Sequence, residues 1–146
     1  MQRSSRSASS VPRLDSQLRQ ILEARHHDPF AALGRHRRHD GDVLRVLVPH
    51  AAYVRLGEDG PWLDRIEGSD LFQHRLVEAE ILPVHYSLYW EDGTGNQHVT
   101  IDPYTFPPQI PDFDLHLFGE GRHWHIHRLL GARPWVVNGV EGVLFA

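Results

Sequence analysis

The sequence predicts a mainly β protein, built as a small antiparallel β-sandwich with an N-terminal helix and a short helical C-terminal segment. Between residues 43 and 101, apolar and polar residues alternate in short runs, as they do in strands with one buried face. Turn-forming residues separate these runs at the spacing typical of small sandwiches. The helical period of 3.6 residues occurs only before and after this region. With 146 residues, the chain is long enough for one such domain and its hydrophobic core.

Residues 13–30 are predicted to hold a helix followed by an Asp-Pro-Phe turn. The helix is indicated by apolar residues at helical spacing, namely Leu14, Leu18, Ile21 and Leu22. Asp15 or Ser16 can cap its first turn. The residue before Pro29 avoids the α region, so the helix is expected to end ahead of that proline. Residues 1–12 show no such apolar pattern, and we expect them to form a disordered tail.

Residues 31–110 are predicted to form the sandwich. Five segments are typical of strands, and they cover residues 43–49, 52–56, 71–77, 84–90 and 97–101. In the fourth segment, alternation places four side chains on the core face: Val84, Tyr86, Leu88 and Trp90. Tyr89 is then expected on the opposite face. Residues 91–96 (EDGTGN) predict the hairpin turn that joins the last two strands.

Four prolines after Asp102 interrupt the strand pattern, so residues 111–134 are predicted to be a helical linker. It would contain a helical turn at residues 112–117 and a short helix at residues 122–130 that ends at a glycine. An Asn-Gly turn signal and an apolar run then predict a strand. Such a strand needs a partner for its backbone hydrogen bonds, so residues 135–146 are expected to begin another, truncated module.

Composition excludes several classes of function. The formal net charge of −4 predicts no binding to nucleic acid, and the absence of cysteine excludes disulfides and thiolate chemistry. The sequence has no apolar run of the roughly 20 residues that span a membrane, so no membrane partner is expected. The first residues lack the apolar stretch of a secretory signal, and we expect a cytoplasmic protein.

Twelve histidines are unusual for this length, and three of them form an HxHxH pattern at His123, His125 and His127. On a strand these three side chains would share one face and could ligate a metal ion. On a helix only the first and the third align, and a polar helix face is the simpler interpretation. A metal-binding protein using these residues remains an alternative hypothesis.

Aromatic side chains are the residues that best fit a ligand role. Sugar rings dock on aromatic faces because their C–H surfaces are apolar while their hydroxyl groups need a polar rim. Three aromatic residues are candidates for carbohydrate contact: Trp62, Tyr89 and Trp124. No pair of acids is forced together by the spacing, and no nucleophile motif is present, so no catalytic residue is predicted.

Five segments in order carry a family resemblance: HHDPFAALGRH (26–36), YSLYWEDG (86–93), IDPYTFPP (101–108), LHLFGEGRHWHIHRLLGARP (115–134) and NGVEGVLFA (138–146). With these five segments in this order, the chain resembles the N-terminal region of bacterial 1,4-alpha-glucan (glycogen) branching enzymes. The resemblance covers nearly all of the chain after about Leu18. Trp62 and the histidine-rich loop at residues 35–39 depart from it.

The resemblance implies an immunoglobulin-like sandwich that precedes a family 48 carbohydrate-binding module and a catalytic barrel. These neighbours and an α-glucan would be the partners of a noncatalytic accessory module, with no cofactor. The family transfers α-1,4-glucan chains to 6-hydroxyl groups with carboxylates of the barrel, so none of its catalytic residues maps onto this chain. The Asp-Pro-Phe and Asp-Pro-Tyr motifs are predicted to be structural turns, because Asp accepts backbone N–H bonds, Pro fixes φ and the aromatic ring anchors the turn in the core. The alternative hypothesis is that the chain is an independent carbohydrate-binding domain and not an accessory module.

Overall fold

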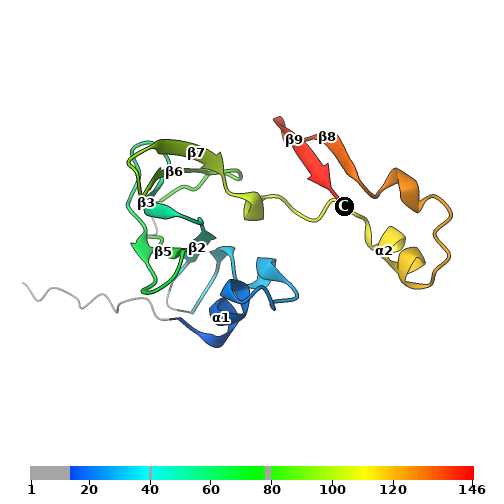
Figure 1. Cartoon of the computed structure of the whole chain (residues 1–146), viewed down its shortest axis with the longest axis horizontal. Helices are drawn as coiled ribbons and strands as arrows, with labels where there is room; N and C mark the ends of the chain where they lie inside the picture. The colour runs from blue at the N-terminus through cyan, green and yellow to red at the C-terminus, as the bar shows by residue number, and fades with distance from the viewer. Residues whose placement is uncertain (1–13, 40, 78–79) are drawn as a thin grey trace, which may run out of the picture. The chain divides into compact units, whose positions relative to one another are not determined.

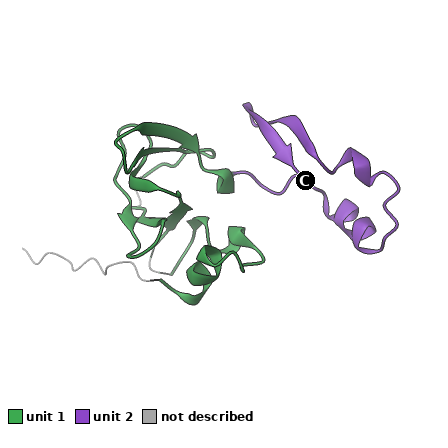
Figure 2. Cartoon of the chain, in the orientation of Figure 1, with its two compact units in different colours: residues 1–105 green, residues 106–146 purple. Residues whose placement is uncertain are grey.

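The computed structural model describes residues 14–39, 41–77 and 80–146, so the predicted disordered tail lies outside the described residues. The chain divides into two compact units, residues 1–105 and 106–146 (Figure 2). The first unit is mainly β and begins with a helix, which confirms the predicted fold class. The predicted domain limits at residues 110 and 134 remain predictions.

Two antiparallel sheets build the first unit (Figure 1). One sheet has the strand order β1–β2–β5–β4, with bounds Gly34–His36, Val43–Leu47, Leu71–Arg75 and Asp64–Arg65. The other has the order β3–β6–β7, with bounds Ala51–Leu56, Ser87–Asp92 and Gln97–Ile101. All five predicted strands are present, but the fourth begins at Ser87. Val84, predicted on its core face, lies outside the strand and is exposed. The sequence did not indicate β1 and β4, because segments of two or three residues are too short to show alternation.

Strand β2 is buried on both faces, which explains its nearly continuous apolar sequence. Leu44 and Val46 belong to the core cluster that also holds Val54 and Leu88 of the second sheet. Leu47 of the same strand packs against the other cluster, which the helix joins. The sandwich core therefore lies on one side of β2 and the helix packing on the other.

The N-terminal helix α1 spans Ser16–Leu22, and Asp15 is its cap. Oδ1 of Asp15 accepts a hydrogen bond from the backbone N–H of Leu18 at 2.9 Å. The helix ends earlier than predicted because Ala24 adopts a left-handed conformation with φ of 53°. Pro29 therefore does not set the end of the helix.

The two Asp-Pro-aromatic motifs form matching turns, as predicted for structural elements. Oδ1 of Asp28 accepts from the N–H of Phe30 at 3.2 Å, and Oδ1 of Asp102 accepts from that of Tyr104 at 3.1 Å. Each turn continues into a 3₁₀ helix, Pro29–Ala31 (η1) and Pro103–Thr105 (η2). The rings of Phe30 and Tyr104 meet edge to face with centroids 5.2 Å apart, so the two turns pack against each other.

The second unit contains α2 (Asp112–Gly119), a 3₁₀ helix at Ile126–Arg128 (η3) and the hairpin β8–β9 (Ala132–Val137 and Val140–Phe145). The helical turn predicted at residues 112–117 is confirmed as part of α2. The strand predicted after the Asn-Gly turn signal is confirmed as β9, and β8 is the partner with which it pairs along its whole length. Asn138 and Gly139 join them with φ of 50° and 81°, the backbone of a tight hairpin turn.

Within residues 106–146, all of which the structure describes, no residue is buried. Several large apolar side chains are exposed there, among them Phe113, Phe118, Trp124, Val143 and Phe145. This unit therefore leaves much of its apolar surface exposed. Across the described residues of the chain, no helix is long and apolar enough to cross a membrane.

Candidate functional site

A groove with a volume of about 350 Å³ lies on the β3–β6–β7 sheet of the first unit. It brings together Trp62 and Tyr89, two of the three aromatic residues predicted to contact carbohydrate. We call it the Trp62 groove, and it is lined by Arg55, Trp62, Tyr89, Trp90, Glu91, Gln97, His98 and Val99.

Backbone pairing along β3 places Trp62. The N–H of Leu56 donates to the carbonyl of Pro61 at 3.0 Å, and Trp62 forms a bridge with Arg55. The indole is 62% exposed although the ring of Tyr53 meets it edge to face at 6.4 Å. The guanidinium of Arg55 lies 5.3 Å from the ring centroid, a cation–π contact. The side chain is thus held by neighbours on one side and open to a ligand.

The strand register places Tyr89 at the centre of the groove. It pairs with Arg55 of β3 on one side and with Val99 of β7 on the other. Directly paired residues point to the same face, so these three side chains form a row across the sheet. Tyr89 faces away from the core, as predicted, and is half-buried.

Trp90 and His98 form the edge of the groove. Their rings stack with centroids 4.1 Å apart and planes 21° from parallel. Nε2 of His98 lies 3.1 Å from Oδ2 of Asp92, which holds the imidazole in place. Trp90 packs against the main core cluster, as the predicted core face requires. The stack therefore joins a core residue to the groove surface.

Two buried N–H groups of the groove have no hydrogen-bond acceptor among the described residues, Nε of Arg55 and Nε1 of Trp90. An unpaired buried donor costs about 1–3 kcal/mol, and such groups in native proteins call for an explanation. Both belong to residues that line the Trp62 groove.

This arrangement suits binding rather than catalysis. Apolar ring surfaces beside amide, imidazole and carboxylate groups match a sugar, which has apolar faces and a rim of hydroxyl groups. Glu91 is the one carboxylate among the lining residues of the groove. Glycosidic bond cleavage by acids needs two carboxyl groups that face the scissile bond.

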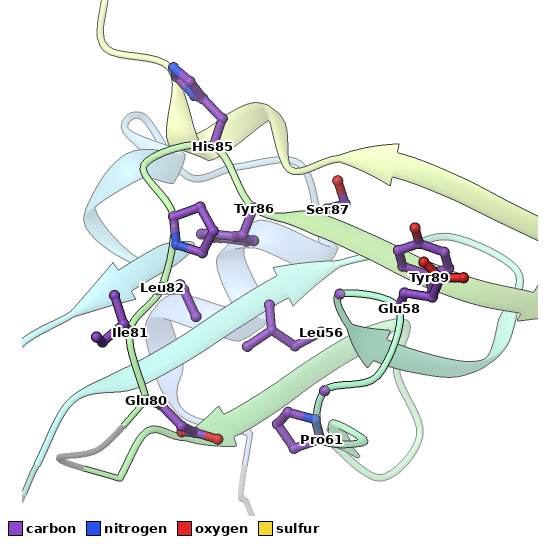
Figure 3. A pocket seen from close by; sticks show the side chains of 13 residues that line it. Leu56, Glu58, Pro61, Glu80, Ile81, Leu82, His85, Tyr86, Ser87 and Tyr89 are labelled. Atoms are coloured by element: carbon purple, nitrogen blue, oxygen red, sulfur yellow. The ribbon is translucent and has the colours of Figure 1, made fainter.

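A second hollow of about 370 Å³ lies where β3 ends and β6 begins (Figure 3). Two carboxylates line it, Glu58 and Glu80, but they lie at opposite ends of the hollow in Figure 3. The carboxylate of Glu80 accepts from the N–H of Val77 at 2.9 Å and lies 3.2 Å from Nε2 of His74. Because those contacts occupy Glu80, the pair does not form an acid–base site.

Comparison of the sequence with known proteins shows the family of the chain. Residues 14–104 match the sequence profile described as "alpha-1,4-glucan branching enzyme GlgB, N-terminal domain". The match covers more than half of the chain. The chain belongs to this family of branching-enzyme N-terminal domains. The matched range ends within one residue of the first structural unit, so the family domain and the sandwich coincide.

Relatives of this GlgB N-terminal domain are similar over both units. A 1,4-alpha-glucan branching enzyme GlgB of Methylococcus capsulatus is 54% identical over 139 residues, 95% of this chain and 19% of the relative. That of Nitrosococcus oceani is 44% identical over 88% of this chain and 17% of its own length. The chain thus spans less than a fifth of the curated relatives it matches.

The third aromatic candidate, Trp124, lies in the second unit of the chain, outside the range that matches the family profile. It is 89% exposed, in the turn between α2 and η3. The structure therefore groups two of the predicted contact residues in one groove of the first unit, and Trp124 lies in the second unit.

The predicted helix at residues 122–130 is wrong, since only Ile126–Arg128 is helical, as one 3₁₀ turn. Nε2 of His123 lies 2.7 Å from Oδ1 of Asp114, and its Nδ1 accepts from the N–H of His125 at 3.2 Å. These side-chain bonds stabilise a turn in competition with a helix. The rings of His125 and His127 are 6.2 Å apart, and the described residues contain no group of three potential metal ligands.

Sequence reasoning missed Arg55, His98 and Val99 as groove residues. His98 and Val99 could have been found from the predicted hairpin, because its register pairs Tyr89 with Val99 and Trp90 with His98. The contact between Trp62 and Arg55 could not be predicted from the sequence, because it depends on how the loop after β3 returns to that strand.

Proposed function

We propose that this domain is the noncatalytic N-terminal accessory module of a 1,4-alpha-glucan branching enzyme and that its Trp62 groove contacts α-glucan. The observation that carries the second part is the convergence of Trp62 and Tyr89 on one groove. The family membership and the relatives' name supply the ligand class. The proposed enzyme acts in glycogen biosynthesis in the cytoplasm and moves α-1,4-glucan chains to α-1,6 positions.

The proposal includes docking of the second unit on a neighbouring module of the same enzyme. No residue of the second unit is buried, and its hairpin exposes Val136, Val143 and Phe145. Apolar surface of this kind is typical of an interface between domains. The expected neighbours are the family 48 module and the catalytic barrel that the relatives' full length accommodates.

Titration of the chain with maltoheptaose, followed by backbone amide shifts, tests the groove. Shifts are expected at Arg55, Tyr89 and Val99, which form the row across the sheet. Trp62→Ala should weaken binding by about tenfold or more, since truncation of an exposed Trp at a binding surface commonly costs over 1.4 kcal/mol.

Trp124→Ala is the matched control, because it removes another exposed tryptophan from the second unit. Unchanged affinity in this variant and loss in Trp62→Ala would support the groove. The reverse pattern, or no shift with millimolar maltoheptaose, would reject glucan contact there. Amylose incubated with the chain alone should keep its iodine spectrum, and new α-1,6 branches would contradict the noncatalytic role.

A further inference from the structure

The hollow in Figure 3 shares a wall with the Trp62 groove. We call it the Leu56 pocket, and its lining includes Leu56, Glu58, Pro61, Leu82, Tyr86 and Ser87. Tyr89 lines both the pocket and the groove. Pro61, next to Trp62 in the chain, lines the pocket while Trp62 lines the groove. The two hollows are therefore adjacent and lie on the two sides of Tyr89.

We propose that the Leu56 pocket is a second α-glucan subsite, next to the Trp62 groove on the other side of Tyr89. The inference rests on the proposed function of the groove. One glucan chain would then lie over the row Arg55–Tyr89–Val99 and extend past Tyr89 toward Ser87, which precedes it on the same face of β6.

The lining of the pocket has the chemistry of a sugar site. Leu56 and Tyr86 are buried core residues whose edges form its apolar floor, and Pro61 and Leu82 add apolar walls. Glu58 and the hydroxyl of Ser87 supply polar groups, and Tyr89 also lines the pocket. Volumes of about 350 and 370 Å³ each lie in the range of small-molecule sites.

The loop that separates the two hollows is held firmly, so both can exist before the ligand arrives. The N–H of Gly57 donates to the carbonyl of Ser87 at 2.8 Å, and the N–H of Leu63 donates to the carbonyl of Val54 at 2.9 Å. These bonds fix both ends of the loop that carries Glu58 and Trp62. A preformed site avoids the free energy of ordering on binding.

A glucan that reaches both subsites gains a second contact at high effective concentration. Maltoheptaose should therefore bind the full chain at least about tenfold more tightly than maltotriose. In the wild-type protein it should also shift the amide signals of Gly57 and Ser87, whereas maltotriose bound in the groove leaves them in place. This measurement needs no variant.

The double variant Glu58→Ala, Ser87→Val removes two polar groups of the pocket and leaves the lining of the groove unchanged. Its maltotriose affinity should equal that of the wild type, and its preference for maltoheptaose should be lost. An unchanged melting temperature shows that the fold is kept. Equal affinities of the two sugars in the wild type, or a preference that the double variant retains, would overturn the second subsite while the groove stands. Absence of binding by both sugars would reject the groove and the pocket together.

Discussion

The phenolic hydroxyl of Tyr86 donates a hydrogen bond to Oδ2 of Asp102, and both side chains are buried. Asp102 also accepts the N–H of Tyr104 at 3.1 Å. Burial raises the pKa of Asp102 above its usual range in spite of these two donors. Burial and the adjacent carboxyl also raise the pKa of Tyr86. This pair joins the start of β6 to the turn that ends the first unit.

Replacing Tyr86 with Phe should lower the free energy of unfolding by about 1–3 kcal/mol near neutral pH, because it leaves a buried carboxylate without one donor. Since the pKa of Asp102 is raised in the folded state, its ionisation costs stability as the pH rises above the unfolded value of about 3.9. Loss of the Tyr86 hydroxyl raises the pKa of Asp102 further. The variant's loss of unfolding free energy relative to the wild type should therefore be larger at about pH 7 than at about pH 4, as measured by denaturant unfolding.

Tyr104→Phe is the control for this pair, because it keeps the backbone donor to Asp102 and removes only a hydroxyl. Its stability should change little and without a pH dependence. A Tyr86→Phe deficit that is the same at both pH values would contradict the role assigned to Asp102.

Asp15 links the helix to the sheet, and its substitution should separate two effects. Its Oδ1 caps α1, and its Oδ2 lies 3.4 Å from Nη2 of the buried Arg45. Burial lowers the pKa of Arg45, and Asp15 opposes that shift. Asp15→Ala loses the cap and the counter-ion and should cost about 2 kcal/mol in thermal unfolding, allowing for the partial exposure of Asp15.

Asp15→Asn keeps a good capping oxygen but removes the charge. It should therefore cost less than half as much as Asp15→Ala. Equal losses in the two variants would assign the whole effect to the ion pair with Arg45, and no loss in either would contradict both contacts.

The sequence predicted those elements whose cause is local. Alternation located the five longer strands of the first unit, and the Asp-Pro motifs located both turns. Strand β8 was not predicted, and it contains Pro134, a residue that is rare in central strands. In a two-stranded hairpin each strand is an edge, so a proline costs no ladder bond on its outer side. The Trp62 groove depends on the return of one loop to β3, which no local pattern encodes.

The hairpin between β6 and β7 depends on Asp92. Its carboxylate accepts from the N–H and hydroxyl of Thr94 at 2.8 and 2.7 Å and from the N–H and side chain of Asn96 at 3.0 Å each. Hydrogen bonds from Thr94, His98 and Asn96 hold the pKa of Asp92 well below its usual range. A lowered folded pKa contributes stability above the unfolded value of about 3.9, and that stability is lost as the pH falls below it.

Asp92→Ala should therefore destabilise the domain at about pH 7 and leave it close to the wild type at strongly acidic pH. Denaturant unfolding across this range measures the difference, and amide exchange should report the loss mainly in residues 91–98. Asp59→Ala removes an exposed acid from another turn and should have little effect. A pH-independent deficit in Asp92→Ala would show that the charge of Asp92 is not what stabilises the hairpin.

Gly60 sets the path of the loop that carries Trp62, so Gly60→Ala should disturb the groove without touching its side chains. A Cβ at this position would lie 1.8 Å from the carbonyl oxygen of Leu56, a contact that only a backbone shift can relieve. Such overpacking commonly costs about 1–3 kcal/mol. Gly93→Ala, where a Cβ meets nothing within 4 Å, should stay within about 0.5 kcal/mol of the wild type. Tryptophan fluorescence and maltoheptaose titration should change in Gly60→Ala and not in Gly93→Ala. Equal glucan affinity in both variants would mean that the position of the loop does not control the groove.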